Sequence, residues 1–182
     1  NTPNLPGMAH GFLVYNEAGP RLVGHAGNTG DFHSNLILAP EAGFGVFISV
    51  TGGSESSAGR TDLTNAIIGR VFPEEPAARE PRPSAEASPA GRYRANRRDY
   101  SRPAREEYDI VVAEAGDDAL TMTSQDETTY WERTGPLTYE KVTGARPGGP
   151  FERIQFHSGE TGLVLSFSNQ PYMAYRRVAT EE

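Results

Sequence analysis

The sequence predicts a mainly β protein, in which antiparallel strands and one helix from the end of an α/β domain are followed by a small antiparallel β-barrel. Three observations support this fold class. Short apolar runs separated by turn-forming residues dominate the chain, only 58–72 has helical spacing, and a proline-rich stretch separates two groups of runs. The predicted organisation is an incomplete domain at 1–74, a linker at 75–89 and a barrel at 90–182.

Four short apolar runs make up most of the first block. They cover 11–16, 21–27, 32–39 and 44–51. Because only a few turn-forming residues separate them, we expect antiparallel neighbours rather than parallel strands, which need long crossovers. The last run is apolar at almost every position, which predicts a strand covered on both faces.

The stretch 58–72 predicts the one helix. Its apolar side chains recur at helical spacing and include Leu63, Ala66, Ile67, Val71 and Phe72. Pro73 ends it. One helix covers only one face of a four-stranded sheet. We therefore expect the first block to be the closing part of a larger domain.

The second block begins after five prolines within 17 residues, a composition typical of an extended, semi-rigid linker. Beyond it lie eight short apolar runs, at 91–95, 108–112, 119–123, 129–133, 137–142, 151–156, 162–167 and 171–178. Several alternate apolar and polar residues, which indicates a closed barrel or a sandwich. Its aromatic residues are expected in the barrel core, with a ligand cavity as the alternative; they are Tyr130, Trp131, Tyr139, Phe151, Phe156, Tyr172 and Tyr175.

Composition excludes several functions. The chain has 182 residues, a net charge of -7 and a pI near 5.2, which disfavours a nucleic-acid surface. The mean hydropathy is -0.56 and no apolar run approaches 20 residues, so we expect no membrane span. Cysteine is absent, and the four histidines lack metal-binding spacing, so the sequence predicts no metal site.

The most specific motif lies between residues 24 and 46. His25-Ala26-Gly27 is followed by Phe32-His33-Ser34, a Pro40-Glu41 turn and then Gly45-Val46. In these elements the sequence resembles the penicillin-recognising, class C β-lactamase-like serine hydrolases, which include D-alanyl-D-alanine peptidases and esterases. Members carry a His-Gly-Gly or Lys-Thr-Gly triplet, a strand with Phe-x-Ser, a Pro-Glu turn and a last apolar strand with Gly-Val.

The resemblance implies cleavage of an amide or ester through an acyl-serine, without metal or cofactor, in a small-molecule or peptide substrate. The triplet strand would form one wall of the site, with Ala26 and Gly27 against the substrate. The amide of Asn28 would be an oxyanion donor, and His25 would help to shape the pocket. The alternative is that Gly24 and Gly27 are strand-end glycines and His25 is a partly exposed strand residue.

Two motifs of that family are missing. The only lysine, Lys141, has Thr138 three residues before it, so there is no Ser-x-x-Lys. No tyrosine has an asparagine two positions later. We expect the isolated chain to be inactive and the nucleophile to lie in an N-terminal part of the same enzyme, which would be its partner.

The second block resembles the lipocalin-like barrel that is often appended to these hydrolases. The resemblance rests on Gly91-Arg92-Tyr93-Arg94, an Asp117-Asp118 turn, Gly135-Pro136-Leu137 and Val142-Thr143-Gly144. Six arginines gather between 92 and 105, with acidic residues nearby. This pattern favours a solvated, salt-bridged surface over an anion site.

A non-enzymatic function is the alternative: a barrel that acts as a binding or accessory module, with residues 1–74 pairing with another chain. Open strand edges would favour association, including a domain-swapped homo-oligomer. Export of the family predicts a periplasmic or secreted protein, with the cytoplasm as the other possibility. An arginine-rich, lysine-poor composition indicates a bacterial source.

Overall fold

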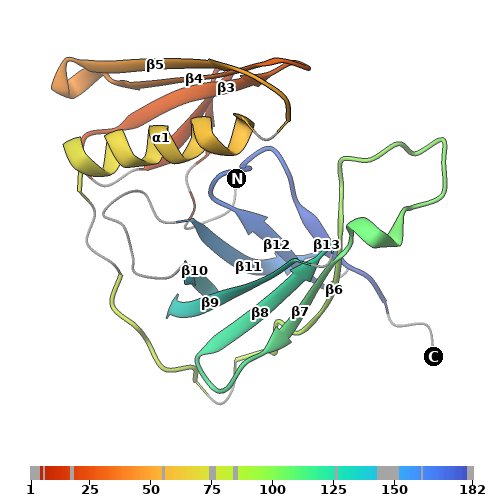
Figure 1. The fold of residues 1–182 in the computed structure, drawn as a ribbon. Coiled ribbons are helices and arrows are strands. Elements are labelled where there is room, and N and C mark those ends of the chain that lie inside the picture. Colours follow the sequence, from red (N-terminus) through yellow and green to blue (C-terminus); the bar gives the residue numbers. More distant parts are fainter. Residues whose placement is uncertain are drawn as a thin grey trace. The chain divides into compact units, whose positions relative to one another are not determined.

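The computed structural model describes residues 5, 7–16, 19–54, 56–73, 77–83, 86–125, 127–142, 152–160 and 162–179. The chain divides into two compact units, one built mainly from 6–76 and the other from 77–146 and 152–182. Figure 1 shows the sheet and helix of the first unit and the barrel of the second. Antiparallel strands dominate both, and the described residues form one α-helix, so the predicted fold class is confirmed.

The first unit is a five-stranded antiparallel sheet. In spatial order its strands are β1 (Met8–Ala9), β2 (Phe12–Asn16), β3 (Leu22–Asn28), β4 (Phe32–Ala39) and β5 (Phe44–Thr51). A short 3-10 turn, η1 (Pro40–Ala42), joins β4 to β5, and α1 (Ser56–Val71) follows. The four predicted strands are present, and the two-residue β1 adds an edge that the sequence pattern did not predict.

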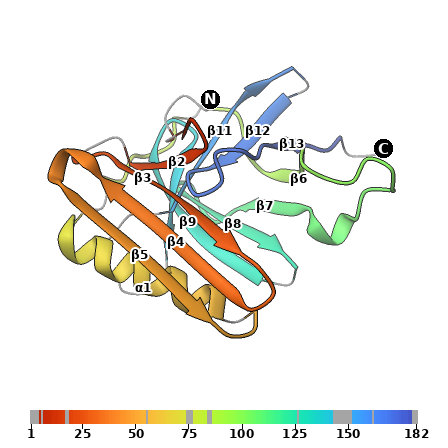
Figure 2. The ribbon, with the colours of Figure 1, turned by 90° about the horizontal axis from the view of Figure 1, so that it is seen from above.

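Helix α1 packs on one face of this sheet, against β4 and β5 (Figures 1 and 2). The core between them contains Leu22, Ile37, Ala39 and Ile68. The predicted helix was nearly correct in its bounds, but its predicted buried face was wrong. Leu63 is 48% exposed, whereas the buried positions of α1 are Arg60, Thr64, Ile68 and Gly69. The reason is that Arg60 and Thr64 find hydrogen-bond partners on the sheet, which makes their burial possible.

On the opposite face of the sheet, the described residues of this unit form no covering element (Figure 2). Leu36 and Phe47 are paired across β4 and β5 and share this face. Phe47 is 66% exposed and Phe32 58% exposed. The expectation that β5 is covered on both faces is therefore wrong for the described residues.

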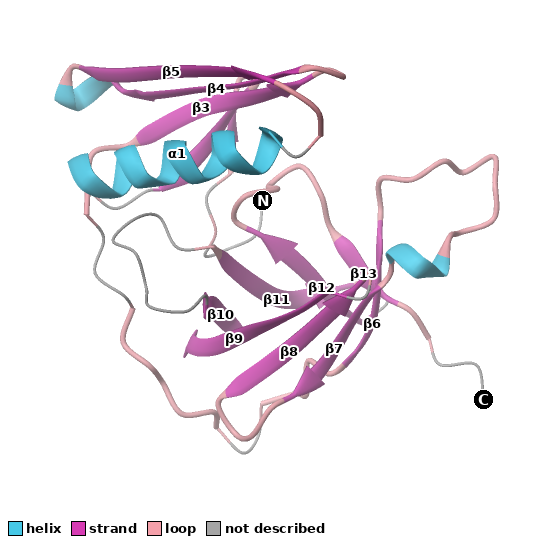
Figure 3. Cartoon of the chain, in the orientation of Figure 1, coloured by secondary structure: helices cyan, strands magenta, loops and turns pink. Residues whose placement is uncertain are grey.

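The second unit is a closed antiparallel barrel of eight strands, which confirms one of the two predicted architectures and excludes the sandwich (Figure 3). The strands are β6 (Gly91–Ala95), β7 (Ile110–Glu114), β8 (Ala119–Ser124), β9 (Glu127–Gly135), β10 (Thr138–Val142), β11 (Arg153–Gly159), β12 (Gly162–Phe167) and β13 (Tyr175–Arg177). Closure pairs β13 with β6, so each of the described barrel strands has a neighbour on both sides. The 3-10 turn η2 (Glu106–Tyr108) precedes β7.

The barrel core contains only some of the aromatic residues predicted for it. Trp131, Tyr139 and Phe156 are almost completely buried. Tyr130 and Tyr172 are instead 57% and 45% exposed. Tyr175 is partly buried against the core, and the predicted position Phe151 lies outside the described residues.

The segment before the barrel is held to it by a buried arginine. Arg133, on β9, is 1% exposed, and its Nη2 lies 3.0 Å from Oε1 of Glu86. Its Nη1 donates to the carbonyl oxygens of Glu80 and Pro81, at 3.1 and 3.0 Å. The described residues of this segment form no helix or strand but belong to the barrel unit.

In the part of the chain that the structure describes, no helix combines the length and apolarity that a bilayer span requires.

Candidate functional site

The second half of β3 has a hydrogen-bonding edge that no described strand occupies. On one side, β3 pairs with β4 from Val23 to Asn28. On the other side, its pairing with β2 ends at Gly24. The predicted site residues His25, Ala26, Gly27 and Asn28 all lie beyond that point. We call the unpaired side of these four residues the open edge of β3.

The register determines which main-chain groups face the open edge. The amide of Thr29 donates to the carbonyl of Phe32 at 2.8 Å, so this pair is hydrogen-bonded. In an antiparallel ladder, alternate residues turn their amide and carbonyl to opposite sides of the strand. The main-chain groups of Ala26 and Asn28 therefore face the open edge, and those of His25 and Gly27 face β4.

Beneath the end of β3, the side chain of Asn28 belongs to a polar network. Its Oδ1 accepts a hydrogen bond from Nη1 of Arg60 at 3.1 Å and lies 2.9 Å from Nδ1 of His33. The same Nη1 donates to the carbonyl of Ser34 at 2.9 Å. Arg60 thus ties the N-terminal part of α1 to both β3 and β4. The side chain of Asn28 is thus fixed by Arg60 and His33, while its main-chain amide faces the open edge of β3.

Two atoms of this network have no hydrogen-bond partner among the described residues. They are Nε2 of His33 and Nε of Arg60, and both are buried. The nearby Tyr15 is half-buried, and burial raises the pKa of its hydroxyl above the ordinary value, while the charge of Arg60 acts in the opposite direction. The described hydrogen-bond partners of the Arg60 guanidinium are all neutral oxygen atoms.

His25 lies on the other face of the sheet. It is exposed and is paired with Leu36 across β3 and β4. The side chains of His25 and Asn28 therefore point to opposite faces, although they are three residues apart on one strand. The four predicted residues therefore lie on the strand segment that borders the open edge, but their side chains do not form one cluster.

Arg60 and His33 are the site residues that sequence reasoning missed. A signal for Arg60 was present in the spacing of Arg60, Thr64 and Ile68, which are four residues apart and lie on one helical face. The apolar residues of the helix suggested a neighbouring face instead. For His33 the sequence offered a place in the Phe32-His33-Ser34 motif and, as an alternative, a position facing His25 across adjacent strands. The structure instead directs these two side chains to opposite faces of the sheet.

The only lysine of the sequence lies in the barrel. Lys141 is on β10, and its Nζ is 3.2 Å from Oε2 of Glu152. Thr138 is on the same strand, so the two residues do not share the helical geometry that a Ser-x-x-Lys motif uses. Within the described residues, no group of three or more histidine, aspartate or glutamate side chains could hold a metal ion.

No protein-family model matches the sequence, and no curated protein matches it. Solved structures of a protein named SurE are similar in fold. The crystal structure of SurE with D-Leu aligns at a TM-score of 0.52 and 16% identity, over 92% of this chain and 38% of the SurE chain. A second SurE structure aligns at 0.51 and 15% identity, over 92% and 37% of the two chains. This chain therefore spans less than two fifths of the SurE chains, and the likeness concerns the fold.

Proposed function

We propose that this chain is the C-terminal part of a β-lactamase-like serine hydrolase, which cleaves an amide or ester through an acyl-serine. The nucleophile would lie outside this chain. Strand β3 would be one wall of the active site, and the amide of Asn28 would donate to the oxyanion. The observation that carries the proposal is the open edge of β3, because it presents the amide of Asn28 and the carbonyl and amide of Ala26 to an incoming substrate.

The uncovered face of the sheet supports the same proposal. Phe32 and Phe47 are exposed beside Leu36, on a face that carries His25. Apolar side chains gathered on one sheet face are typical of a surface that another layer covers. The remainder of the hydrolase domain would supply that layer, together with the serine, lysine and tyrosine that the chain lacks.

A substrate class is suggested by one of the SurE structures. That protein was crystallised with D-Leu, a D-amino acid. The resemblance in sequence is to enzymes that include D-alanyl-D-alanine peptidases. We therefore propose a peptide or ester that contains a D-amino acid residue as the substrate.

The test uses the full-length native protein and two variants of one residue. Asn28→Pro removes the main-chain N–H that would bind the oxyanion, whereas Asn28→Ala keeps it and removes only the side chain. Loss of one oxyanion donor costs about 100- to 1000-fold in turnover. We expect Asn28→Pro to slow hydrolysis of a D-alanyl ester by that factor, and Asn28→Ala to slow it much less.

Thermal unfolding of both variants shows whether each is folded. Equal activity of the folded Asn28→Pro protein and the parent would contradict the role of this amide. If the full-length protein hydrolyses no ester or amide, the hydrolase proposal fails and the accessory-module alternative remains.

A further inference from the structure

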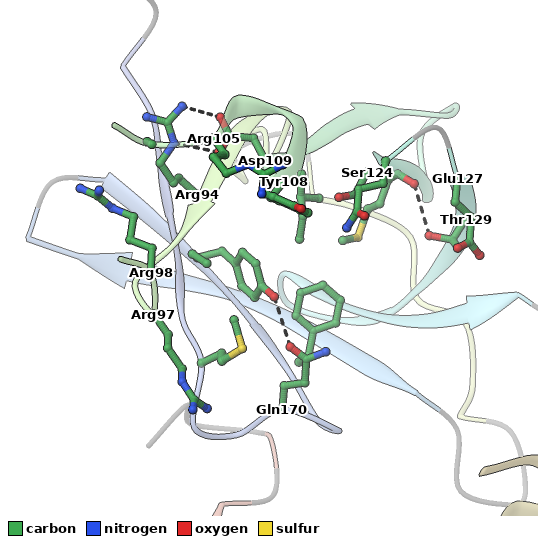
Figure 4. A pocket seen from close by; sticks show the side chains of 18 of the residues that line it. Arg94, Arg97, Arg98, Arg105, Tyr108, Asp109, Ser124, Glu127, Thr129 and Gln170 are labelled. Carbon is green, nitrogen blue, oxygen red and sulfur yellow. Dashed lines mark hydrogen bonds and ion pairs between the residues drawn. The ribbon is translucent and has the colours of Figure 1, made fainter. Parts of the chain in front are cut away.

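The barrel encloses a cavity of about 720 Å³, which opens beside the segment between β6 and β7 (Figure 4). The volume lies within the range of small-molecule sites, about 300 to 1,000 Å³. All of its lining residues belong to the barrel unit. The sequence left a ligand cavity open as the alternative to a filled core. The structure has both, and Ile110, Met122, Trp131 and Phe167 of the core line the cavity.

Residues along strand β9 show where the cavity ends inside the barrel. Glu127, Thr129 and Trp131 line the cavity in succession. Arg133, two residues further along the same strand, does not line it and holds the segment before the barrel. The cavity therefore ends near Trp131, and it is closed there by side chains.

The inner part of the cavity is apolar. Its wall includes Ile110, Met122, Trp131, Phe167 and Met173. Two polar groups of this wall are already satisfied. Nε1 of Trp131 donates to Oγ1 of Thr129 at 2.8 Å, and the hydroxyl of Tyr175 donates to Oε1 of Gln170 at 3.2 Å. A ligand placed here would gain by burying an apolar body and would need no hydrogen bond at this depth.

The charged part of the lining carries more cations than anions, although the whole chain has a net charge of -7. Six cationic and four acidic side chains line it, namely Arg94, Arg97, Arg98, Arg102, Arg105 and Lys141 against Asp99, Asp109, Glu127 and Glu152. Four of the six cations are already paired. Arg94 forms a double hydrogen bond with Asp109, at 2.8 and 2.6 Å, and further pairs join Arg102 to Asp99, Arg105 to Glu107 and Lys141 to Glu152.

Arg97 and Arg98 are the two lining cations that pair with no carboxylate in the described part of the chain. Each guanidinium lies over a tyrosine ring instead, Arg97 at 5.7 Å from the centroid of Tyr172 and Arg98 at 4.2 Å from that of Tyr100. Figure 4 shows both on one side of the cavity, with Glu127 and Thr129 on the other. These arginines are therefore available to an anion at the opening.

We propose that the barrel cavity binds an amphipathic anion, with its apolar body against Trp131, Phe167 and Met122 and its carboxylate or phosphate at Arg97 and Arg98. Guanidinium groups bind both kinds of oxyanion with paired hydrogen bonds. The proposal does not depend on the hydrolase function, because every residue that it uses lies in the barrel.

The sequence contains one tryptophan, and it lies in the cavity wall, so its fluorescence reports directly on occupancy. The test titrates the 182-residue chain with three probes of equal chain length: decanoate, decanol and decyltrimethylammonium. We expect a saturable change in Trp131 emission with decanoate, and at least tenfold weaker binding of the cation. Raising the salt concentration is expected to reduce this preference, because exposed charges are screened.

The variant Arg97→Gln/Arg98→Gln tests the head-group site. We expect it to weaken decanoate binding about threefold to tenfold, the range for one or two exposed charge contacts, and to leave decanol binding unchanged. Arg21→Gln/Arg70→Gln is the matched control, since it removes the same charge from exposed positions of the other unit. Ser124→Phe places a large side chain in the cavity wall and is expected to weaken all probes.

Two results would overturn the proposal. One is the absence of a saturable Trp131 response to decanoate in the unmodified chain. The other is equal or tighter binding of the decyl cation. An unchanged ratio of decanoate to decanol affinity in the folded Arg97→Gln/Arg98→Gln protein would exclude those two arginines as the anion site.

Discussion

Gly24 is the position on β3 where the sheet leaves no room for a side chain. A Cβ built there would overlap the main-chain oxygen of Leu36 and lie 3.0 Å from Cε2 of Tyr15. The first of these atoms belongs to the backbone, so it cannot move without disturbing the pairing of β3 with β4. The glycine therefore maintains the strand that presents the candidate site.

We expect Gly24→Ala to destabilise the sheet unit by about 2 to 4 kcal/mol, because overpacking against backbone is costly. Gly30→Ala is the control, since a Cβ there meets no atom within 4 Å. Urea unfolding measures the stability of both variants. Equal midpoints for the two variants would show that β3 accommodates a side chain at Gly24.

The sequence predicted which strand carries the proposed site residues, but not how their side chains are arranged. The motif located His25 and Asn28 on one strand, and the structure confirms that strand. The contact of Arg60 with Asn28 joins residues 32 positions apart, and it depends on how α1 crosses the sheet. Spacing along the chain does not determine such a crossing, and apolar periodicity favoured a different helical face.

The open edge of β3 predicts that the amides along this strand alternate in their protection from hydrogen exchange. We expect the amides of Ala26 and Asn28 to exchange with solvent much faster than those of His25 and Gly27, which face β4. Hydrogen exchange followed by NMR resolves the four amides. Uniform protection of all four would mean that another segment occupies the open edge.

Two buried tyrosines make the barrel sensitive to high pH. Burial raises the pKa of Tyr93 and of Tyr139 from 10 to about 12, since ionisation in the core is unfavourable. Their contribution to stability is fully present below the unfolded value near 10 and is lost as the pH rises through 12. Chemical unfolding between pH 8 and pH 12 should therefore show constant stability followed by a steep fall.

Tyr93→Phe removes both the hydrogen bond and the ionisable hydroxyl of this side chain, and the two losses affect stability at different pH. The Tyr93 hydroxyl donates to the carbonyl of Pro89 at 2.7 Å, so the variant should lose about 1 kcal/mol at neutral pH. It should also show a shallower fall above pH 10. An unchanged alkaline slope would mean that Tyr93 does not remain neutral in the folded barrel.

The strands were largely predictable because short turns and alternation are local properties. The runs at 32–39 and 44–51 match β4 and β5 in both bounds. Closure of the barrel and the burial of Arg133 were not predictable, since both depend on pairs formed between distant residues. Composition predicted an extended, semi-rigid linker, and the contact between Arg133 and Glu86 joins the described part of that segment to the barrel.

The uncovered face of the five-stranded sheet predicts self-association of the chain. Phe47 and Phe32 are the most exposed large apolar residues of the sheet. We expect concentration-dependent dimers or larger species, and we expect Phe47→Glu to suppress them by at least fivefold. Sedimentation velocity measures the fraction of dimers and larger species, with Tyr130→Glu on the barrel as the control. A monomeric parent chain at high concentration would contradict the expectation.

We propose that this chain carries the oxyanion strand of a serine hydrolase whose nucleophile lies elsewhere in the native protein. The most direct measurement is intact-mass analysis of the native protein and of the 182-residue chain after treatment with a fluorescent penicillin and a fluorophosphonate. We expect a longer native protein with one adduct on a serine outside this sequence, and no adduct on the isolated chain. Stoichiometric labelling of the isolated chain, or a native protein that consists of this chain alone, would contradict the claim.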